Sequence, residues 1–343
     1  MNHTCYKGSY ERCVPLKGSI QNADTIRLRY TDVSASPLVM DGNLVLAKAD
    51  KSLQWISMES DTTIWKLSFS KAIRELFQTG NLLFASDGGT LYAIHLEDGL
   101  LIKEFADINP SLLFAVVANN ALVFPSFKEG SRLCSIQLSK LEWKDPMALE
   151  GLADFSLKYH EHFIINEAPN FLKCIDPENG RELWKVDVLK DTVQGSFVNE
   201  VPFVKDGKVF VTVFPDRILN IDIQTGTVHW NKTFGTGMNT FSVPDFEENT
   251  LWALSGNTLL EIDRSTGAII SKVSIPLEGN FKLSHSGSDA LIAYSSHKNE
   301  VISLQKRSNT FQRLLNLKDG ATLPPIIANG RLVVLDKKNN LYF

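Results

Sequence analysis

Short apolar runs, each followed by a turn and a second apolar run, recur along the chain. Three such segments align without gaps, at 172–184, 218–230 and 259–271, and a fourth at 91–103 keeps the same apolar positions. In each segment the first, second and fourth residues favour a strand that is buried on at least one face. The pattern therefore predicts a repeated unit of strand, turn and strand.

The turn between the two runs has the residues that a tight hairpin needs. Asp176, Asp222 and Asp263 end the first strand, and an Asp side chain can bond to the backbone two residues on and so begin a turn. A glycine stands at one common position in all four segments: Gly99, Gly180, Gly226 and Gly267. We expect these glycines to supply the positive φ that the hairpin requires.

Weaker copies extend the repeat over most of the chain. In one copy Asp61 takes the glycine position before Trp65, and a copy with a shorter turn reaches Trp143. The first residues of the eight copies lie 38 to 46 residues apart: Leu53, Leu91, Leu133, Leu172, Ile218, Leu259, Val301 and Leu341. A regular period of this length is typical of a repeat architecture.

A second hairpin signal lies upstream of most copies. Pairs such as Asp41-Gly42 and Asp206-Gly207 come before an apolar strand, and a further short strand precedes several of them. Each unit therefore holds four strands, which is one propeller blade. The predicted fold is all-β, an eight-bladed β-propeller with four-stranded antiparallel blades.

The two ends of the repeat region predict how the last blade is completed. The chain stops at Phe343, two residues after the last repeat begins, so the eighth blade lacks its outer strand. The strand-like run at 25–30 has no place in the first blade, and we expect it to close the last one. Closure removes exposed strand edges. On this basis residues 23–343 form a single propeller domain and residues 1–22 are an N-terminal extension.

The turn pattern resembles a known family. The sequence Asp, two residues, Thr or Asn, Gly, three residues and Trp, seen at 176–184 and 222–230, is similar to the PQQ-like repeat of pyrroloquinoline-quinone enzymes. The resemblance runs from about residue 34 to residue 343. It implies three kinds of relative: quinoprotein dehydrogenases, a bacterial outer-membrane assembly lipoprotein, and soluble propellers that bind another protein.

The third kind fits these residues best. Quinoprotein dehydrogenases are much longer, and many hold their cofactor against adjacent cysteines, which this chain lacks. We therefore expect no cofactor, no catalysis and a protein partner. One specific form would be an immunity-type protein that neutralises a bacterial toxin. Two alternatives stay open: an enzyme, or a small-molecule or metal binder, that uses the central funnel, and a periplasmic envelope-assembly factor that has lost its signal.

Charge and hydropathy limit the partners and the location that we expect for the protein. Lys and Arg number 35 against 39 Asp and Glu, which argues against a nucleic-acid binder because such a protein usually has a basic excess. No run of 18 apolar residues occurs, so no membrane helix is expected. The N-terminus has no apolar core of a signal peptide. We expect a cytoplasmic monomer that binds neither nucleic acid nor membrane.

Candidate chemistry is sparse. His160 and His162 would point to the same face of a strand and could share a metal with a third ligand, whereas the plain alternative is two surface histidines. No nucleophile elbow, phosphate-binding loop or zinc-protease motif occurs. The sequence therefore predicts no catalytic residue, no cofactor site and no metal site beyond these weak candidates.

Two long connections after outer strands are the remaining candidates for function. Leu189 and Phe197 lie in the first connection, and Phe234 and Met238 lie in its counterpart one blade later. Together they would form an exposed apolar patch, which is typical of a partner site. In the alternative, these side chains are buried under their own loops. Loops on rigid scaffolds commonly carry function, which favours testing this position first.

Overall fold

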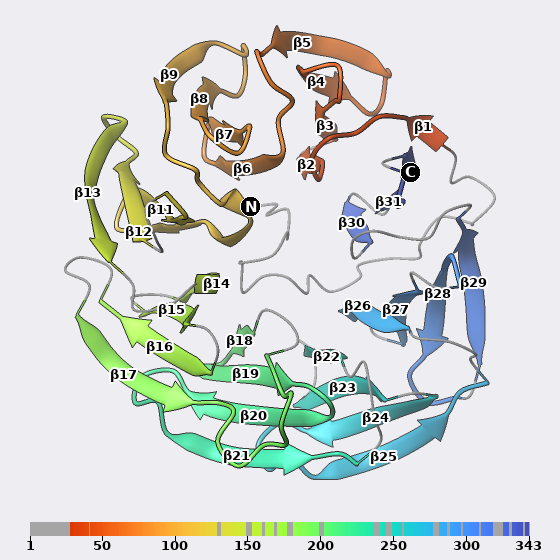
Figure 1. Cartoon of the computed structure of the whole chain (residues 1–343). Helices are drawn as coiled ribbons and strands as arrows, with labels where there is room; N and C mark the ends of the chain where they lie inside the picture. The colour runs from red at the N-terminus through yellow and green to blue at the C-terminus, as the bar shows by residue number, and fades with distance from the viewer. Residues whose placement is uncertain are drawn as a thin grey trace. The chain divides into compact units, whose positions relative to one another are not determined.

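Sheets account for most of the chain that the structure describes. The computed structural model describes residues 28–40, 42–128, 132–148, 153–159, 162–167, 170–176, 181–198, 202–235, 241–244, 249–255, 257–276, 281–286, 289–295, 298–308, 310–317, 325–328, 331–338 and 340–342. These residues fall into two compact units, 31–186 and 28–30 with 187–342. Each unit contains four sheets, drawn and labelled in Figure 1.

The first unit contains four antiparallel sheets in chain order. Their strands are β2 (Leu38–Met40), β3 (Asn43–Ala47), β4 (Ser52–Ser57) and β5 (Thr62–Ser68); β6 (Glu75–Thr79), β7 (Leu82–Ser86), β8 (Leu91–His95) and β9 (Leu101–Phe105); β10 (Val116–Ala118), β11 (Ala121–Ser126), β12 (Arg132–Gln137) and β13 (Glu142–Ala148); β14 (Ala153–Tyr159), β15 (His162–Glu167), β16 (Phe171–Ile175) and β17 (Glu182–Asp187). A short 3-10 helix, η2 (Leu112–Phe114), precedes β10.

The second unit repeats the arrangement with one change. Its strands are β18 (Phe203–Lys205), β19 (Lys208–Val213), β20 (Arg217–Asp222) and β21 (Val228–Thr233); β22 (Phe241–Pro244), β23 (Thr250–Ser255), β24 (Thr258–Asp263) and β25 (Ile269–Ser274); β26 (Lys282–Ser286), β27 (Ala290–Ser295), β28 (Glu300–Gln305) and β29 (Phe311–Asn316); β30 (Ile326–Ala328), β31 (Arg331–Leu335), β32 (Leu341–Tyr342) and β1 (Leu28–Tyr30). The final sheet takes its fourth strand from the other end of the chain.

The fold is the predicted eight-bladed β-propeller. Eight four-stranded antiparallel sheets are present in the described chain, and each is one blade. Every one of the eight residues that begin the sequence repeats lies in the third strand of its blade and is buried: Leu53, Leu91, Leu133, Leu172, Ile218, Leu259, Val301 and Leu341. The period read from the sequence is therefore the period of the blades.

The last blade is completed as the sequence predicts. Within the second unit, β1 pairs antiparallel with β32, and Leu28 lies opposite Tyr342. The two-residue strand β32 is the third strand of this blade, and β1 is its fourth. The proposed extension, residues 1–22, lies outside the described residues, and the single domain at 23–343 stays a prediction.

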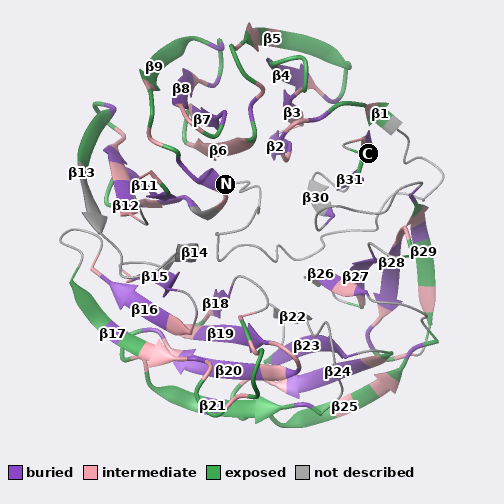
Figure 2. Ribbon diagram, in the orientation of Figure 1, coloured by how far each residue is buried: buried purple, intermediate pink, exposed green. Residues whose placement is uncertain are grey.

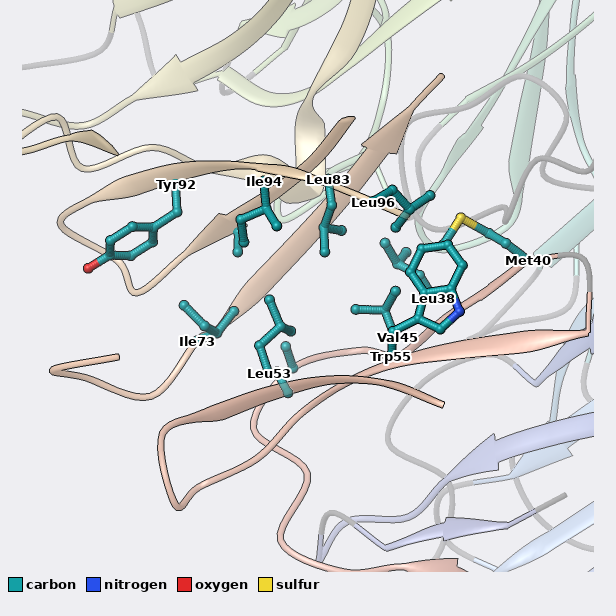
Figure 3. Close-up of a cluster of buried hydrophobic side chains, with 13 residues drawn as sticks. Leu38, Met40, Val45, Leu53, Trp55, Ile73, Leu83, Tyr92, Ile94 and Leu96 are labelled. Carbon is teal, nitrogen blue, oxygen red and sulfur yellow. The ribbon is translucent and has the colours of Figure 1, made fainter. Parts of the chain in front are cut away.

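Burial follows the position of a strand in its blade. The second and third strands are almost wholly buried, whereas the fourth strands are largely exposed (Figure 2). The core lies between neighbouring blades: Leu38, Val45 and Leu53 of the first blade face Leu83 and Ile94 of the second (Figure 3). Strands buried on both faces need continuous apolar runs, which is why the repeats are so easily seen in the sequence.

The turn after the third strand is built as predicted in the fifth and sixth blades, whereas Gly180 of the fourth lies outside the described residues. The Asp222 carboxylate accepts hydrogen bonds at 3.0 Å from the backbone N–H groups of Gln224 and Thr225. Gly226 then has a φ of +71° and donates its N–H to the Asp222 carbonyl. Asp263 and Gly267 repeat this arrangement in the next blade. The Asp side chain thus begins the turn and the glycine closes it.

The tryptophan of the repeat locks one blade to the next. The Trp65 indole N–H donates to the Leu96 carbonyl at 2.8 Å, and its ring lies where a Cβ on Gly99 would approach to 2.7 Å. In the second unit Trp230 of the fifth blade contacts the sixth blade in the same way, donating to the Arg264 carbonyl at 3.0 Å and covering Gly267. A glycine is therefore needed at this position for two reasons: its φ is positive, and it leaves room for the ring to approach closely. We call this contact the tryptophan lock.

Candidate functional site between the second and third blades

The contact between the second and third blades departs from the tryptophan lock. The strand position that Trp65 and Trp230 occupy in their blades holds Lys103 in the second blade, opposite Ala93. The glycine position in the third blade holds Leu141, with a φ of +51°. Instead of an indole N–H, the Lys103 ammonium donates to the Leu141 carbonyl at 2.6 Å. A flexible side chain thus replaces a rigid ring in this contact.

Trp143 does not replace the missing lock, because it lies on the opposite face of its strand. In β13 the residue at the lock position is Lys144, opposite Ser135, whereas Trp143 pairs with Ile136. Neighbouring residues of a strand point to opposite faces. The Trp143 ring therefore faces the preceding blade, 6.5 Å from the Phe105 ring and 6.1 Å from the Phe124 ring.

A pocket of about 430 Å³ lies at this departure. Its walls come from the end of β9, the connection that follows it, the turn between β11 and β12, and β13: Phe105, Ala106, Asp107, Ile108, Ser126, Lys128, Arg132, Cys134 and Trp143. Its volume falls within the range of small-molecule sites, about 300–1,000 Å³. We call it the Trp143 pocket.

The Trp143 pocket combines aromatic walls with charged groups. The Lys128 ammonium pairs with the Asp107 carboxylate. Arg132 is the second cationic residue of the lining. The Ser126 hydroxyl donates to the Ile108 carbonyl at 2.5 Å, which ties the turn of the third blade to the connection before it. The pocket is therefore held by contacts from both blades.

Burial makes the one thiol in the pocket unreactive. Desolvation raises the pKa of Cys134 to about 11, against a smaller opposing effect of the Ser126 hydrogen bond. At neutral pH the side chain is a neutral thiol, and the thiolate is the nucleophilic form. The pocket thus offers surfaces for binding and lacks an activated nucleophile among the described residues.

The structure describes one of the two weak candidates for a metal ligand. His162 begins β15 and its imidazole is partly buried, whereas His160 lies outside the described residues. Within the described chain no group of three or more His, Cys, Asp or Glu side chains is placed to hold a metal ion. Another cluster of charges, the buried ion pair of Lys173 and Glu167 at 2.6 Å, lies within a blade and joins neighbouring strands.

The structure separates the four residues proposed for partner binding. Phe197 is 49% exposed and Leu189 is partly exposed, both in the connection before the fifth blade. Phe234 is only 9% exposed and packs with Phe210 and Trp230, so it belongs to the core and not to a surface patch. Met238 lies outside the described residues.

The connection at 187–198, which we call the Val193 loop, presents its own apolar surface. Val193 at its tip is 66% exposed. The Phe197 ring stacks on Phe214 at 4.9 Å with an interplanar angle of 11°. The Arg217 guanidinium donates to the Lys190 carbonyl at 2.8 Å, and the Phe214 N–H donates to the Phe197 carbonyl at 2.9 Å. The fifth blade therefore fixes the loop at two points.

Internal turns give the Val193 loop a defined shape. The Leu189 carbonyl accepts both the backbone N–H of Thr192 at 3.1 Å and its hydroxyl at 2.6 Å. The Val193 carbonyl accepts the same pair of bonds from Ser196, at 3.2 and 2.8 Å. The two successive turns hold Val193 between them, so its exposure is a property of an ordered loop.

The comparisons with known proteins agree with the repeat. The sequence profile of a family described as outer membrane protein assembly factor BamB matches residues 170–270, which contain three of the aligned repeats. Over these residues the chain is similar to the PQQ-like repeat, and the described sheets have the fold of a β-propeller. No curated protein sequence matches this propeller.

Solved structures share the fold of this propeller. BamB from Moraxella catarrhalis superposes with a TM-score of 0.70 at 12% identity, covering 93% of this chain and 99% of that one. Saccharomyces cerevisiae Sqt1 gives 0.68 at 13%, covering 95% and 99%. Quinohemoprotein alcohol dehydrogenase from Comamonas testosteroni gives 0.62 at 10%, covering 94% and 74%. At such low identities the likeness shows the fold alone.

In the described ranges of this propeller, no helix has the length and apolar character to cross a bilayer.

Sequence reasoning missed the Trp143 pocket, although a signal was present. Trp65, Trp184 and Trp230 stand twelve positions after the first residue of their repeats, whereas Trp143 stands ten positions after Leu133. The shorter turn shifts the register so that the tryptophan lies on the other face of its strand, and Lys103, twelve positions after Leu91, marks the missing lock.

Proposed function

We propose that this propeller is a non-catalytic protein that binds another protein through the Val193 loop. The observation that carries the proposal is the exposed, ordered apolar surface of Val193 and Phe197. Exposed apolar groups at a fixed position are typical of partner sites. Because the loop is already held by Phe214 and Arg217, binding would lose little conformational freedom.

The experiment is affinity capture from cells of the native organism, read by mass spectrometry. The bait is the wild-type chain, beside a Val193→Ser variant and a Val193→Ser/Phe197→Ser double variant. The matched control is Ile270→Ser, which replaces another exposed aliphatic residue, 55% exposed against 66% for Val193, on the outer strand β25. The single variant Val193→Ser leaves the Phe197 ring stacked on Phe214, so it changes the exposed surface without removing a contact that holds the loop.

One protein captured in stoichiometric amount by the wild type and the control, and lost from both loop variants, is the expected result. Loss of an apolar contact at the centre of an interface costs about 1–2 kcal/mol or more, a factor of about 5–30 in affinity. Capture that is equal for all four baits would assign the partner to another surface. A blank for the wild type would remove the proposal.

The narrower form of the proposal is an immunity-type protein that neutralises a bacterial toxin in the cytoplasm. It predicts that the captured protein is an enzyme whose activity falls to background when the propeller is added in equimolar amount. The propeller is then a monomer that forms a one-to-one complex. A captured partner without enzymatic activity, or an active enzyme in the complex, would contradict this form and leave the broader one standing.

A second candidate function is favoured by the profile match at 170–270, because that family is described as an outer membrane protein assembly factor. In this form the propeller acts in the bacterial envelope and the captured partner is an envelope protein. Cell fractionation separates the two candidates: the first places the native protein in the cytoplasm, and the second places it in the periplasm or at the outer membrane.

A further inference from the structure

Arg217 lies beside the Val193 loop, and its guanidinium is held in one position. Arg217 is the first residue of β20, and its Nε–H donates to the side-chain oxygen of Asn231 on β21. Its Nη1 group donates to the Lys190 carbonyl at 2.8 Å. Both acceptors are neutral. The guanidinium is therefore already placed before a partner arrives, so binding would cost little of its rotamer freedom.

The positive charge of Arg217 is not paired within the described chain. The neighbouring Asp216 is buried, and its carboxylate accepts a backbone N–H at 2.8 Å. The Asp187 carboxylate accepts a backbone N–H of its own loop at 3.0 Å. Among the described residues neither of these groups, nor Asp191, forms an ion pair with the guanidinium. The Nη2 group of the partly exposed Arg217 has no acceptor there, so it can donate to a ligand.

The fixed guanidinium and the apolar surface of the loop belong to one small area. Phe214, three residues before Arg217, carries the stacked Phe197 ring. Lys190, whose carbonyl Arg217 binds, lies three residues before Val193. Three residues of chain separate Cα atoms by at most about 11 Å. Arginine and aromatic side chains contribute much of the binding energy at protein interfaces, so one partner surface would cover these groups together.

We propose that the partner of the Val193 loop presents a carboxylate beside an apolar side chain. The carboxylate pairs with the Arg217 guanidinium, and the apolar side chain covers Val193. A single negative charge fits this position better than a doubly charged phosphate, because Asp187 and Asp191 lie in the same loop and repel additional negative charge. The inference rests on the proposed function, since it names the chemistry of the partner at that loop.

The first step of the test needs no knowledge of the natural partner. A library of random peptides displayed on phage is selected against the full chain, and the affinity of each enriched peptide is measured by fluorescence anisotropy. We expect the enriched sequences to carry an aspartate or glutamate a few positions from an apolar residue. Val193→Ser is expected to weaken these peptides by about tenfold, as the loss of a central apolar contact does.

The second step compares the tightest peptide with an analogue in which its side-chain carboxylate is replaced by the amide. The wild type is expected to prefer the carboxylate by about five- to tenfold. In Arg217→Gln this preference should fall to about twofold or less, whereas Lys190→Gln, which removes an equal charge from the loop, should retain it. Because the preference is measured within each variant, a looser loop in Arg217→Gln does not remove the test.

Failure of this inference and failure of the proposed function are separate results. If the peptides depend on Val193 but bind no more tightly than their amides, the inference is overturned and the Val193 loop remains a binding surface. If selection yields no peptide that Val193→Ser weakens, the inference is also overturned, and the capture experiment decides the proposed function by itself.

Three further results would overturn the inference. The first is a preference for the carboxylate that persists in Arg217→Gln, because the pairing would then involve another group. The second is a preference that Lys190→Gln abolishes as completely as Arg217→Gln does, because the effect would then be one of loop charge alone. The third is tighter binding by an analogue with phosphoserine in place of the acidic residue, because the site would then select phosphate.

Discussion

The tryptophan lock predicts that two glycines with the same backbone conformation respond differently to the same substitution. Gly267 has a φ of +69° and Gly235 has a φ of +77°, so an alanine is unfavourable at both. A Cβ on Gly267 would lie 2.8 Å from two ring carbons of Trp230, whereas a Cβ on Gly235 would meet nothing within 4 Å. Only the first substitution therefore disturbs the contact between blades.

The magnitudes follow from these two effects. The left-handed conformation costs an alanine about 1–2 kcal/mol relative to glycine, and this cost applies to both positions. Forcing the Trp230 ring aside adds about 1–3 kcal/mol of overpacking. The ring also donates to the Arg264 carbonyl, and a weakened bond of this kind costs about 1 kcal/mol. Gly267→Ala should thus exceed Gly235→Ala by about 2–4 kcal/mol.

Urea unfolding followed by circular dichroism measures the difference, and a third background isolates its cause. In a Trp230→Leu protein the ring is gone, so the excess cost of Gly267→Ala over Gly235→Ala should shrink to what remains from Lys232, whose flexible side chain would lie 2.9 Å from the new Cβ. Equal destabilisation by the two alanines in the wild type would refute the reasoning. So would a difference that persists unchanged in the Trp230→Leu background, because the ring would then not be its cause.

Three further predictions concern single groups. Gly99→Ala should destabilise the protein more than Gly80→Ala in the same urea experiment, because a Cβ would approach Trp65 to 2.7 Å at the first position and meet nothing at the second. Burial raises the pKa values of Cys134 and Cys174 to about 11, so both thiols should resist alkylation at pH 8 and react in urea, as mass spectrometry would show. The hydrogen bond from Lys208 lowers the pKa of the Asp222 carboxyl in the folded protein. The ionised carboxylate therefore stabilises the fold above about pH 4, and this stabilisation is lost at lower pH. Asp222→Asn should therefore be less stable than the wild type at pH 7, and the gap should narrow as the pH falls below about 4; a gap independent of pH would contradict this.

Much of the fold could be predicted from the sequence because the physical requirements repeat. A third strand buried on both faces needs an apolar run, and the hairpin after it needs an Asp and a glycine, so Ile218, Asp222 and Gly226 leave a pattern that can be aligned with other copies. The closure of the last blade by residues near Tyr30 followed from the missing outer strand. These features depend on local chemistry and on the count of strands.

The candidate sites depend on properties that composition does not show. Whether Trp143 faces the preceding or the following blade depends on one step of register, and a shorter turn changes it. Phe197 and Phe234 occupy similar positions after outer strands, yet one is exposed at a loop end and the other is buried beside Trp230. Their spacing along the chain is alike, and only the packing around them separates the two.

The central claim is that the Val193 loop is the surface by which this propeller binds another protein. Hydrogen–deuterium exchange of the chain, alone and in complex with the captured partner, tests it most directly. The account predicts slowed exchange across residues 187–198 on binding, with the outer strand β25 at 269–274 unchanged. Slowed exchange confined to other loops or to outer strands, with 187–198 exchanging as in the free protein, would contradict it.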